Sequence, residues 1–222
     1  MINSVEYLVR DRSEDSAVSG QEVAHGNGFI ARTQQPNRVI AIASSAGGIE
    51  ALTTVVSALP ADFSGAIVIV QHLSPHYQSY LPEILARRTE LTVNEATEGT
   101  KLRAGEIYVT PPNKHSIVNK NGTLSLSDAP KEHYVRPSAE YTFKSLAMSY
   151  REKAVAIVLT GCDGDGKEGV QKIKEMGGKV IAQNEETSQV FSMPYSAIET
   201  GCVDLILPLN EIVDGIINIV MN

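Results

Sequence analysis

The chain has 222 residues, 42% of them hydrophobic and 20% charged, which is enough to bury one sizeable core, and we expect a single globular domain. A net charge of -7 argues against DNA, RNA or an anionic membrane as the main partner, because such partners require a basic surface. The two cysteines, Cys162 and Cys202, suit a reducing cytosol, and no apolar run approaches the ~20 residues of a membrane span, so we expect a soluble, cytoplasmic protein without membrane insertion.

The amino-terminal residues 1–37 mix Ser, Gly, Glu, Asp, Gln and Asn and show no sustained apolar period. Such a segment cannot bury enough apolar surface to order itself. We therefore predict a linker or loosely ordered arm over 1–37 and one folded domain over 38–222.

The predicted domain opens with five small or apolar residues, Val39 to Ala43, followed by Ser44, Ser45 and two glycines. A buried strand that breaks into small turn-forming residues is typical of the first strand-to-helix turn of a parallel sheet. The helix behind this turn is predicted over Ile49 to Leu59, where apolar residues recur at helical spacing and Pro60 ends the pattern.

The rest of the chain continues this alternation of strands and helices. A second apolar, β-branched strand is predicted over Gly65 to Val70, and His72 follows it. The further predicted elements are, in order, a short helix over Leu81 to Arg88, strands over Leu91 to Ala96 and Ile107 to Thr110, a hairpin of Ser116 to Val118 with Thr123 to Leu126, a helix over Ala139 to Arg151 capped by Ser138, a strand over Ala154 to Leu159, a helix over Lys167 to Met176, a strand over Lys179 to Ala182, a helix over Ser196 to Thr200, a strand over Val203 to Leu207 and a helix over Glu211 to Met221. This pattern predicts an α/β fold: a doubly wound, mainly parallel sheet with helices on both faces and a small antiparallel β-hairpin annex.

Three polar residues, Ser45, His72 and Asp165, come directly after predicted buried strands. In a doubly wound sheet the functional crevice lies beyond the carboxyl ends of the strands. A serine hydroxyl becomes a nucleophile when an imidazole takes its proton, and a carboxylate orients that imidazole. The positions therefore favour a Ser-His-Asp triad. They also suit ordinary structural roles, with Ser45 and Asp165 as helix caps and His72 as a hydrogen-bonded polar residue.

The other four histidines are weaker candidates for the base. His25 lies in the arm and His133 in a polar loop, so solvent exposure is expected for both. His76 follows a turn and His115 opens the hairpin; each can line the crevice, but neither ends a buried parallel strand.

No cofactor and no metal ion is expected. Among His, Cys, Asp and Glu, only Asp163 and Asp165 stand at a spacing near that of ligands, and the remaining carboxylates of a calcium loop are missing. Residues Gly161 to Lys167 match the glycine-rich phosphate loop pattern, but Glu168 stands where that loop needs Ser or Thr for magnesium. The two aspartates inside the loop would also repel phosphates.

Seven segments of the chain carry a family pattern: Ile42 to Ala51, Val70 to Leu73, Tyr108 to His115, Arg136 to Ser138, Leu159 to Gly166, Ala182 to Glu185 and Met193 to Ala197. Taken together and in this order, they resemble the catalytic domain of the chemotaxis protein-glutamate methylesterases, the CheB family, over about Arg38 to Met221. The resemblance implies a serine hydrolase that removes methyl esters from glutamyl side chains on chemoreceptor helices, releases methanol and often deamidates glutamines there.

The resemblance also implies roles for individual residues. Ser45 is the expected nucleophile, His72 the general base and acid, and Asp165 the carboxylate that orients His72. The backbone N–H of Cys162 is the expected oxyanion donor. The family usually has Met at this last position.

Two further positions depart from the family pattern. Asp163 stands where the family usually has Gly and adds a negative charge beside the crevice, and Glu140 replaces the usual Asp. Many members also carry an amino-terminal phosphorylatable receiver domain. We expect none in this chain, which leaves the control of activity open.

The expected partners are methylated chemoreceptor helices, with a methyltransferase or a separate response regulator as a further partner. An alternative of another class is a catalytically silent signalling module that keeps the fold and binds a receptor or a methyltransferase. Turnover of a methylated receptor peptide distinguishes the two.

Overall fold

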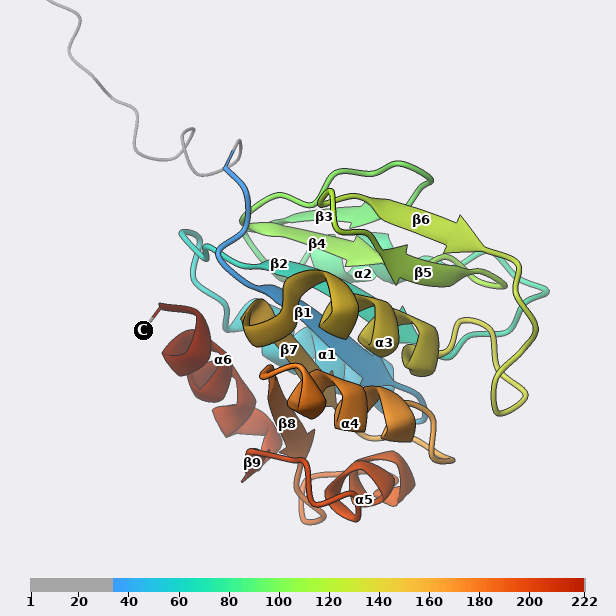
Figure 1. The fold of residues 1–222 in the computed structure, drawn as a ribbon, viewed down its shortest axis with the longest axis vertical. Helices are drawn as coiled ribbons and strands as arrows, with labels where there is room; N and C mark the ends of the chain where they lie inside the picture. The colour runs from blue at the N-terminus through green and yellow to red at the C-terminus, as the bar shows by residue number, and fades with distance from the viewer. Residues whose placement is uncertain (1–33, 222) are drawn as a thin grey trace, which may run out of the picture.

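A seven-stranded parallel sheet forms the centre of the domain in the computed structural model, which describes residues 34–221 (Figure 1). The strands are β1 (Val39–Ser44), β2 (Ala66–Gln71), β3 (Thr92–Glu95), β4 (Glu106–Val109), β7 (Ala154–Val158), β8 (Lys179–Gln183) and β9 (Leu205–Leu207). They lie in the order β3-β4-β2-β1-β7-β8-β9, and every neighbouring pair is parallel. From β1 the chain runs through β2 to the edge strand β3 and returns to β4, and from β7 it runs outward to β9. The topological switch point, where such sheets bind ligands, therefore lies between β1 and β7.

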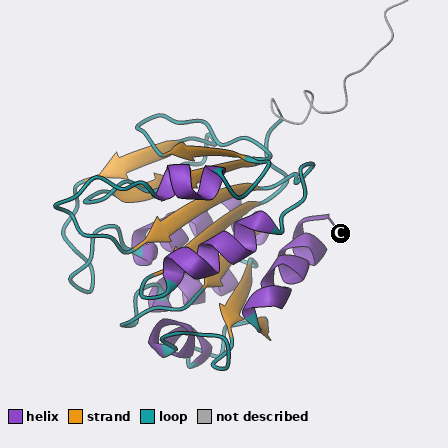
Figure 2. Cartoon of the chain, turned by 180° about the vertical axis from the view of Figure 1, so that it is seen from behind, coloured by secondary structure: helices purple, strands orange, loops and turns teal. Residues whose placement is uncertain are grey.

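Helices cover both faces of the sheet, as Figures 1 and 2 show from opposite sides. One face packs against α1 (Gly48–Ser57), α2 (Leu81–Ala86) and α6 (Ile212–Met221), and the other against α3 (Ala139–Tyr150), α4 (Lys167–Glu175) and α5 (Ser192–Ile198). Residues of β1 alternate between the two cores: Ile40 and Ile42 face the α1 side, and Ala41 and Ala43 face the α3 side. Both faces are buried, which explains the uninterrupted apolar strands.

The predicted hairpin is present as a separate antiparallel pair, β5 (His115–Val118) and β6 (Leu124–Ser127). Its turn contains Gly122 at φ 79°, a conformation that favours glycine. The hairpin packs against α3, where Thr142 Oγ1 donates to Ser116 O at 2.8 Å. The predicted fold class, a doubly wound sheet with a hairpin annex, is confirmed.

Several element boundaries differ from the prediction, most clearly near the carboxyl terminus. Helix α5 spans Ser192–Ile198 and not Ser196 to Thr200, because a proline is tolerated in a first helical turn. The last strand is shorter than predicted and covers only Leu205–Leu207. A 3-10 turn, η3 (Leu209–Glu211), precedes α6, and a similar turn, η2 (Arg151–Lys153), follows α3.

Residues 1–33 of the predicted arm lie outside the described residues, whereas residues 34–37 contact the domain. Gln34 O accepts a hydrogen bond from Ala104 N at 3.2 Å. The Asn37 backbone N–H donates to Ser64 O at 3.2 Å, and its side chain donates to Val220 O at 3.2 Å. Between residues 34 and 221, none of the helices has both the length and the apolar character needed to cross a bilayer.

Candidate active site

Ser45 and His72 follow two paired strands at the carboxyl edge of the sheet. The β1–β2 register pairs Ser44 with Gln71, and His72 N donates to Ser44 O at 3.0 Å. The buried Gln71 side chain links both turns: its amide donates to Ser45 O at 2.9 Å and to His72 O at 3.0 Å, and its oxygen accepts from Ser44 Oγ at 2.7 Å. Gln71 was not among the predicted site residues. A lone amide at the end of an apolar strand was the available signal.

The turn after Ser45 depends on two glycines. Gly47 has φ 76°, which favours a residue without a side chain. A Cβ on Gly48 would overlap the Gln71 amide oxygen and lie 2.8 Å from Ser44 Cβ. The close approach of β1 and β2 at their ends therefore requires glycine at the start of α1.

His72 meets Asp165, which the turn between β7 and α4 carries to the same edge. His72 Nε2 and Asp165 Oδ2 are 2.8 Å apart, and the two side chains are 8% and 0% exposed. Asp165 Oδ2 also accepts from Ala139 N at 2.6 Å, while Oδ1 accepts from Ser138 Oγ at 2.6 Å and from Glu140 N at 3.3 Å. The predicted His72–Asp165 juxtaposition is thus observed, and the carboxylate lies at the amino terminus of α3.

These donors decide the charge of Asp165. Burial opposes the ionisation of Asp165. The opposing contributions are larger and hold the pKa of Asp165 below its ordinary value; they come from the hydrogen bond and charge of His72, then from the Ser138 hydroxyl and the Ala139 N–H. A helix amino terminus also favours an anion. Asp165 is therefore a buried carboxylate that stays ionised near neutral pH.

The Asp165 bond also determines which nitrogen of His72 is available. With Nε2–H donating to the carboxylate, Nδ1 carries the lone pair. Nδ1 is buried and has no hydrogen-bond partner among residues 34–221. It is the nitrogen that can accept a proton from a nucleophile.

A second histidine supports the site from behind. His115 Nδ1 accepts from Ser138 N at 3.1 Å, and its Nε2 donates to Pro130 O at 3.2 Å. Burial lowers the pKa of His115, which favours this neutral form. His115 therefore belongs to the structure that holds Ser138 against Asp165. Its position at the start of the hairpin predicted only a residue that can line the crevice.

Helices α3 and α4 cap each other through the same region. Glu140, in the first turn of α3, accepts from Glu168 N at 2.9 Å and from Gly169 N at 2.6 Å, both in the first turn of α4. Burial raises the pKa of Glu140. The two N–H groups and the charge of Lys144, whose Nζ is 3.5 Å away, lower it by a smaller amount. Asp165, just before α4, in turn accepts from the first N–H groups of α3. This exchange of carboxylates locks the two helix starts together.

The same contacts argue against phosphate binding at the glycine-rich turn. A phosphate loop directs the first N–H groups of its helix at the ligand. Here the N–H groups of Glu168 and Gly169 already donate to Glu140. Within the described part of the chain, no group of three His, Cys, Asp or Glu side chains is arranged to hold a metal ion.

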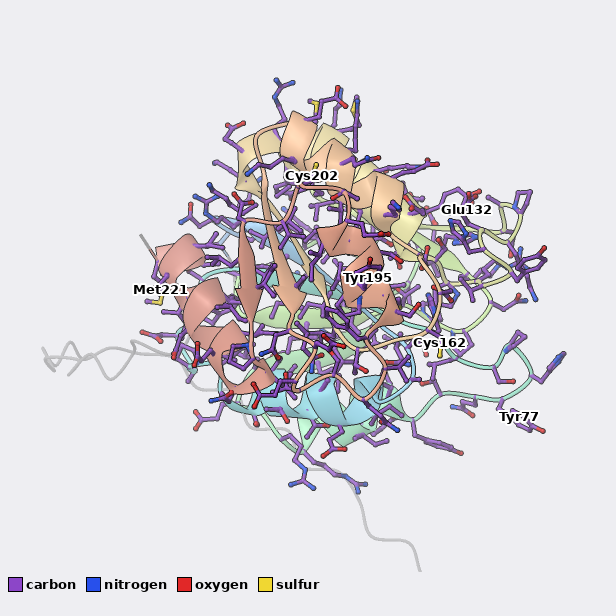
Figure 3. The ribbon with its side chains drawn as sticks, turned by 90° about the horizontal axis from the view of Figure 1, so that it is seen from below. Tyr77, Glu132, Cys162, Tyr195, Cys202 and Met221 are labelled. Carbon is purple, nitrogen blue, oxygen red and sulfur yellow. The ribbon has the colours of Figure 1, made fainter. Side chains whose placement is uncertain are left out.

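The β7–α4 turn passes directly beside Ser45. Ser45 N donates to Thr160 O at 3.0 Å, and a Cβ on Gly161 would lie 2.8 Å from Ser45 Cβ. Cys162 follows at the surface, as Figure 3 shows, with an exposed, unpaired thiol. The backbone at Gly161 and Cys162 is thus next to the candidate nucleophile.

The remaining histidines lie outside this cluster or outside the description. His76 and His133 are exposed, and His133 has φ 48° in the loop before α3. His25 lies outside the described residues.

Fold and site together define a class: a doubly wound α/β protein in which Ser45, His72 and Asp165 follow the neighbouring strands β1, β2 and β7 at the carboxyl edge of the sheet. Comparison with known families gives the particular member of this class. The family model described as CheB methylesterase matches residues 40–216, and the chain belongs to this family.

Known relatives agree with this assignment. A protein of Leptospira interrogans named putative protein-glutamate methylesterase/protein-glutamine glutaminase is 37% identical over 183 residues, covering 82% of this chain and 95% of the relative. Protein-glutamate methylesterase/protein-glutamine glutaminase 2 of Methanosarcina acetivorans is 35% identical over 86% of this chain, and the match covers 56% of that relative. The chain thus spans about half the length of several curated relatives.

A solved structure resembles the domain closely. The crystal structure of the Thermotoga maritima CheB methylesterase catalytic domain aligns with a TM-score of 0.80 at 37% identity. The alignment covers 82% of this chain and 98% of that one.

Proposed function

We propose that this protein is a serine hydrolase that removes methyl esters from glutamyl side chains of a chemoreceptor. The observation that carries the proposal is the 2.8 Å contact of His72 Nε2 with an ionised, buried Asp165, beside the turn that presents Ser45. Membership of the CheB methylesterase family and the names of the curated relatives support the choice of ester.

In the first half of the reaction, Ser45 Oγ attacks the ester carbonyl while His72 Nδ1 takes the hydroxyl proton. Asp165 stays ionised and stabilises the imidazolium. The backbone N–H of Cys162 donates to the oxyanion of the tetrahedral intermediate. The intermediate collapses to an acyl-Ser45 ester as His72 returns the proton to the departing methanol.

In the second half, water replaces methanol. His72 takes a proton from water, the hydroxide attacks the acyl-Ser45 carbonyl, and the proton passes to Ser45 Oγ as it leaves. The product is a glutamate carboxylate. A glutamine side chain in the same position would release ammonia in place of methanol, which gives the deamidase activity that the relatives' names include.

The proposed partner is a methylated chemoreceptor helix, and a methyltransferase or a separate response regulator is a further proposed partner. In this proposal the reaction takes place in the cytoplasm, where the unpaired Cys162 and Cys202 stay reduced.

The test uses the full chain and receptor membranes carrying radiolabelled methyl esters. Release of labelled methanol by the native protein, lost in Ser45→Ala and kept in the exposed-serine control Ser57→Ala, supports the proposal. A fluorophosphonate probe should label Ser45 in the native protein and in Ser57→Ala. Equal release by the native protein and Ser45→Ala would exclude Ser45 as the nucleophile. Absence of release would favour a silent binding module.

A further inference from the structure

A second carboxylate, that of Asp163, lies beside the free nitrogen of His72. Asp163 Oδ2 is 3.7 Å from His72 Nδ1, while Asp165 Oδ2 is 2.8 Å from Nε2. The imidazole therefore lies between two carboxylates, one at each nitrogen. The mechanism above uses only one of them.

The fold holds Asp163 in this position. Its backbone has φ 69°, its Oδ1 accepts from Asp165 N at 2.9 Å, and its carbonyl accepts from Ser192 Oγ at 3.2 Å. The side chain is 33% exposed, so water screens its charge only in part. Asp163 is thus tied to the turn that carries Asp165 and to the start of α5.

The two carboxylates favour opposite neutral tautomers of His72. Asp165 favours a proton on Nε2, which leaves Nδ1 able to accept a proton from Ser45. Asp163 favours a proton on Nδ1, which would block that step. The hydrogen bond to Asp165 at 2.8 Å outweighs the longer, non-bonded contact at 3.7 Å, so the productive tautomer prevails.

Once Nδ1 gains a proton, its electrostatic interaction with Asp163 changes from unfavourable to favourable. The Nδ1 lone pair of neutral His72 faces a negative charge, which is unfavourable, whereas the imidazolium forms an ion pair with the same carboxylate. Asp163 therefore favours the protonated state of His72, the state that forms when Ser45 or water gives up its proton.

We propose that Asp163 is a positioning residue that acts through His72: its carboxylate stabilises the imidazolium in both halves of the reaction and favours it in the resting enzyme. The rate consequence rests on the proposed function. The charge should raise the rate at alkaline pH and move the acid limb of the rate profile to higher pH, compared with a variant that lacks it.

Other charged groups near the pair stay constant in this comparison. His133, in the loop before α3, interacts with the charge of Asp163. His115 on β5 and Glu140 on α3 interact electrostatically with Asp165. Burial raises the pKa of Asp163, although the Asp165 N–H and the His72 charge oppose this. Asp163 accordingly loses its charge at higher pH than an ordinary aspartate, and its effect is confined to pH values above that point.

The first experiment needs no substrate. In full-length protein carrying Ser45→Ala, ¹⁵N NMR follows the imidazole nitrogens of His72 across pH, with and without Asp163→Asn. The amide keeps the shape and removes the charge, and Asp163→Gly removes the side chain at a backbone angle that glycine accepts. Since both changes remove the carboxylate 3.7 Å from Nδ1, we expect both to lower the fraction of His72 that carries a proton on each nitrogen at a given pH. Asp62→Asn, at an exposed position near the amino end of β2, should leave it unchanged.

The second experiment measures kcat/KM against pH for the same variants on a Ser45 background, with p-nitrophenyl acetate and with methylated receptor. We expect the acid limb to move to lower pH and the alkaline plateau to fall by up to about tenfold. A merely structural role would lower the plateau without moving the limb.

An unchanged NMR midpoint in both Asp163 variants would overturn the proposal, whether or not the enzyme turns over. A shifted midpoint with superimposable rate profiles would also overturn it, because the charge of Asp163 would then have no effect on the free energy of the transition state. A shifted midpoint with no turnover by any variant would support the charge coupling and overturn the function proposed above.

Discussion

At the scale of single residues, the acceptor capacity of Asp165 dominates the site. Its two oxygens accept four hydrogen bonds, from His72, Ser138, Ala139 and Glu140. All four partners are donors. A carboxylate can accept from all of them, whereas an amide would place its own NH₂ donor against some of them.

The nucleophile and base should behave as one unit. Ser45→Ala and His72→Ala should each lower kcat by several orders of magnitude, and the double variant should be little worse than either single one, because each residue is useless without the other. Steady-state kinetics on a methylated receptor peptide measures this. His76→Ala is the control. Near-native activity of His72→Ala together with loss in His76→Ala would show that another histidine is the base.

Asp165→Asn should be severe for the reason given above. Whichever oxygen it replaced, the amide NH₂ would face two of the four donors, and at the Oδ2 position it would turn His72 Nε2 into an acceptor and place the proton on Nδ1. The comparable change in a serine protease costs about 10⁴ in kcat. We expect a loss of that order with the fold retained, measured by kinetics and circular dichroism. A loss below tenfold would remove Asp165 from the triad.

At the scale of elements, α3 and α4 depend on each other through Glu140. Glu140→Ala should lower the free energy of unfolding by about 1–3 kcal/mol, because the buried Gly169 N–H and the partly buried Glu168 N–H at the start of α4 lose their acceptor. Glu140→Gln keeps one oxygen and should cost less. Urea denaturation measures both.

The control for this prediction is Glu175→Ala at the exposed end of α4. Glu175 forms a solvent-exposed ion pair with Lys172. Surface pairs of this kind contribute about 0–1 kcal/mol. If Glu140→Ala cost no more than this control, the carboxylate exchange between the helices would be unimportant for stability.

At the scale of the whole molecule, buried and paired carboxylates set the acid stability. Asp165 has a depressed pKa in the folded state, so its stabilising contribution is present above the ordinary aspartate value of about 3.9 and is lost as pH falls through the folded pKa. The pKa of Asp204 is also lowered in the folded state, because its contacts with Lys174 and the Val180 N–H outweigh the effect of burial. Thermal melts should show that the native protein loses stability below about pH 4, and the Asp165→Asn variant should lose less stability than the native protein over the same pH range. A parallel decline in both proteins would contradict the assignment.

The arm provides a test of domain organisation. Because residues 1–33 show no core-forming pattern, their deletion should leave the melting temperature and the basal esterase rate nearly unchanged. Deletion through Asn37 should cost stability, since it also removes the contacts with Ala104, Ser64 and Val220. Calorimetry on both truncations tests this. A large loss on removing 1–33 alone would show that the arm contributes to the folded domain.

The sequence by itself determined the elements and the edge of the sheet where the candidate site lies. Apolar, β-branched runs such as Val39 to Ala43 specify buried parallel strands whatever their neighbours are. Turn residues such as Asn121 and Gly122 specify the hairpin locally. Since strand ends meet at one edge of a parallel sheet, Ser45, His72 and Asp165 could be grouped without a structure.

The tertiary structure alone decided how side chains from distant elements pair. The hydrogen bond between Ser138 and His115 joins residues 23 positions apart in the chain, and that between Gly169 and Glu140 joins residues 29 positions apart. The choice of His72 Nε2 for Asp165, and of Nδ1 for Asp163, follows from the orientation of a ring packed between two turns. No local pattern encodes these pairings, because they depend on which faces of α3, α4 and the sheet meet, and only packing of the whole chain fixes that.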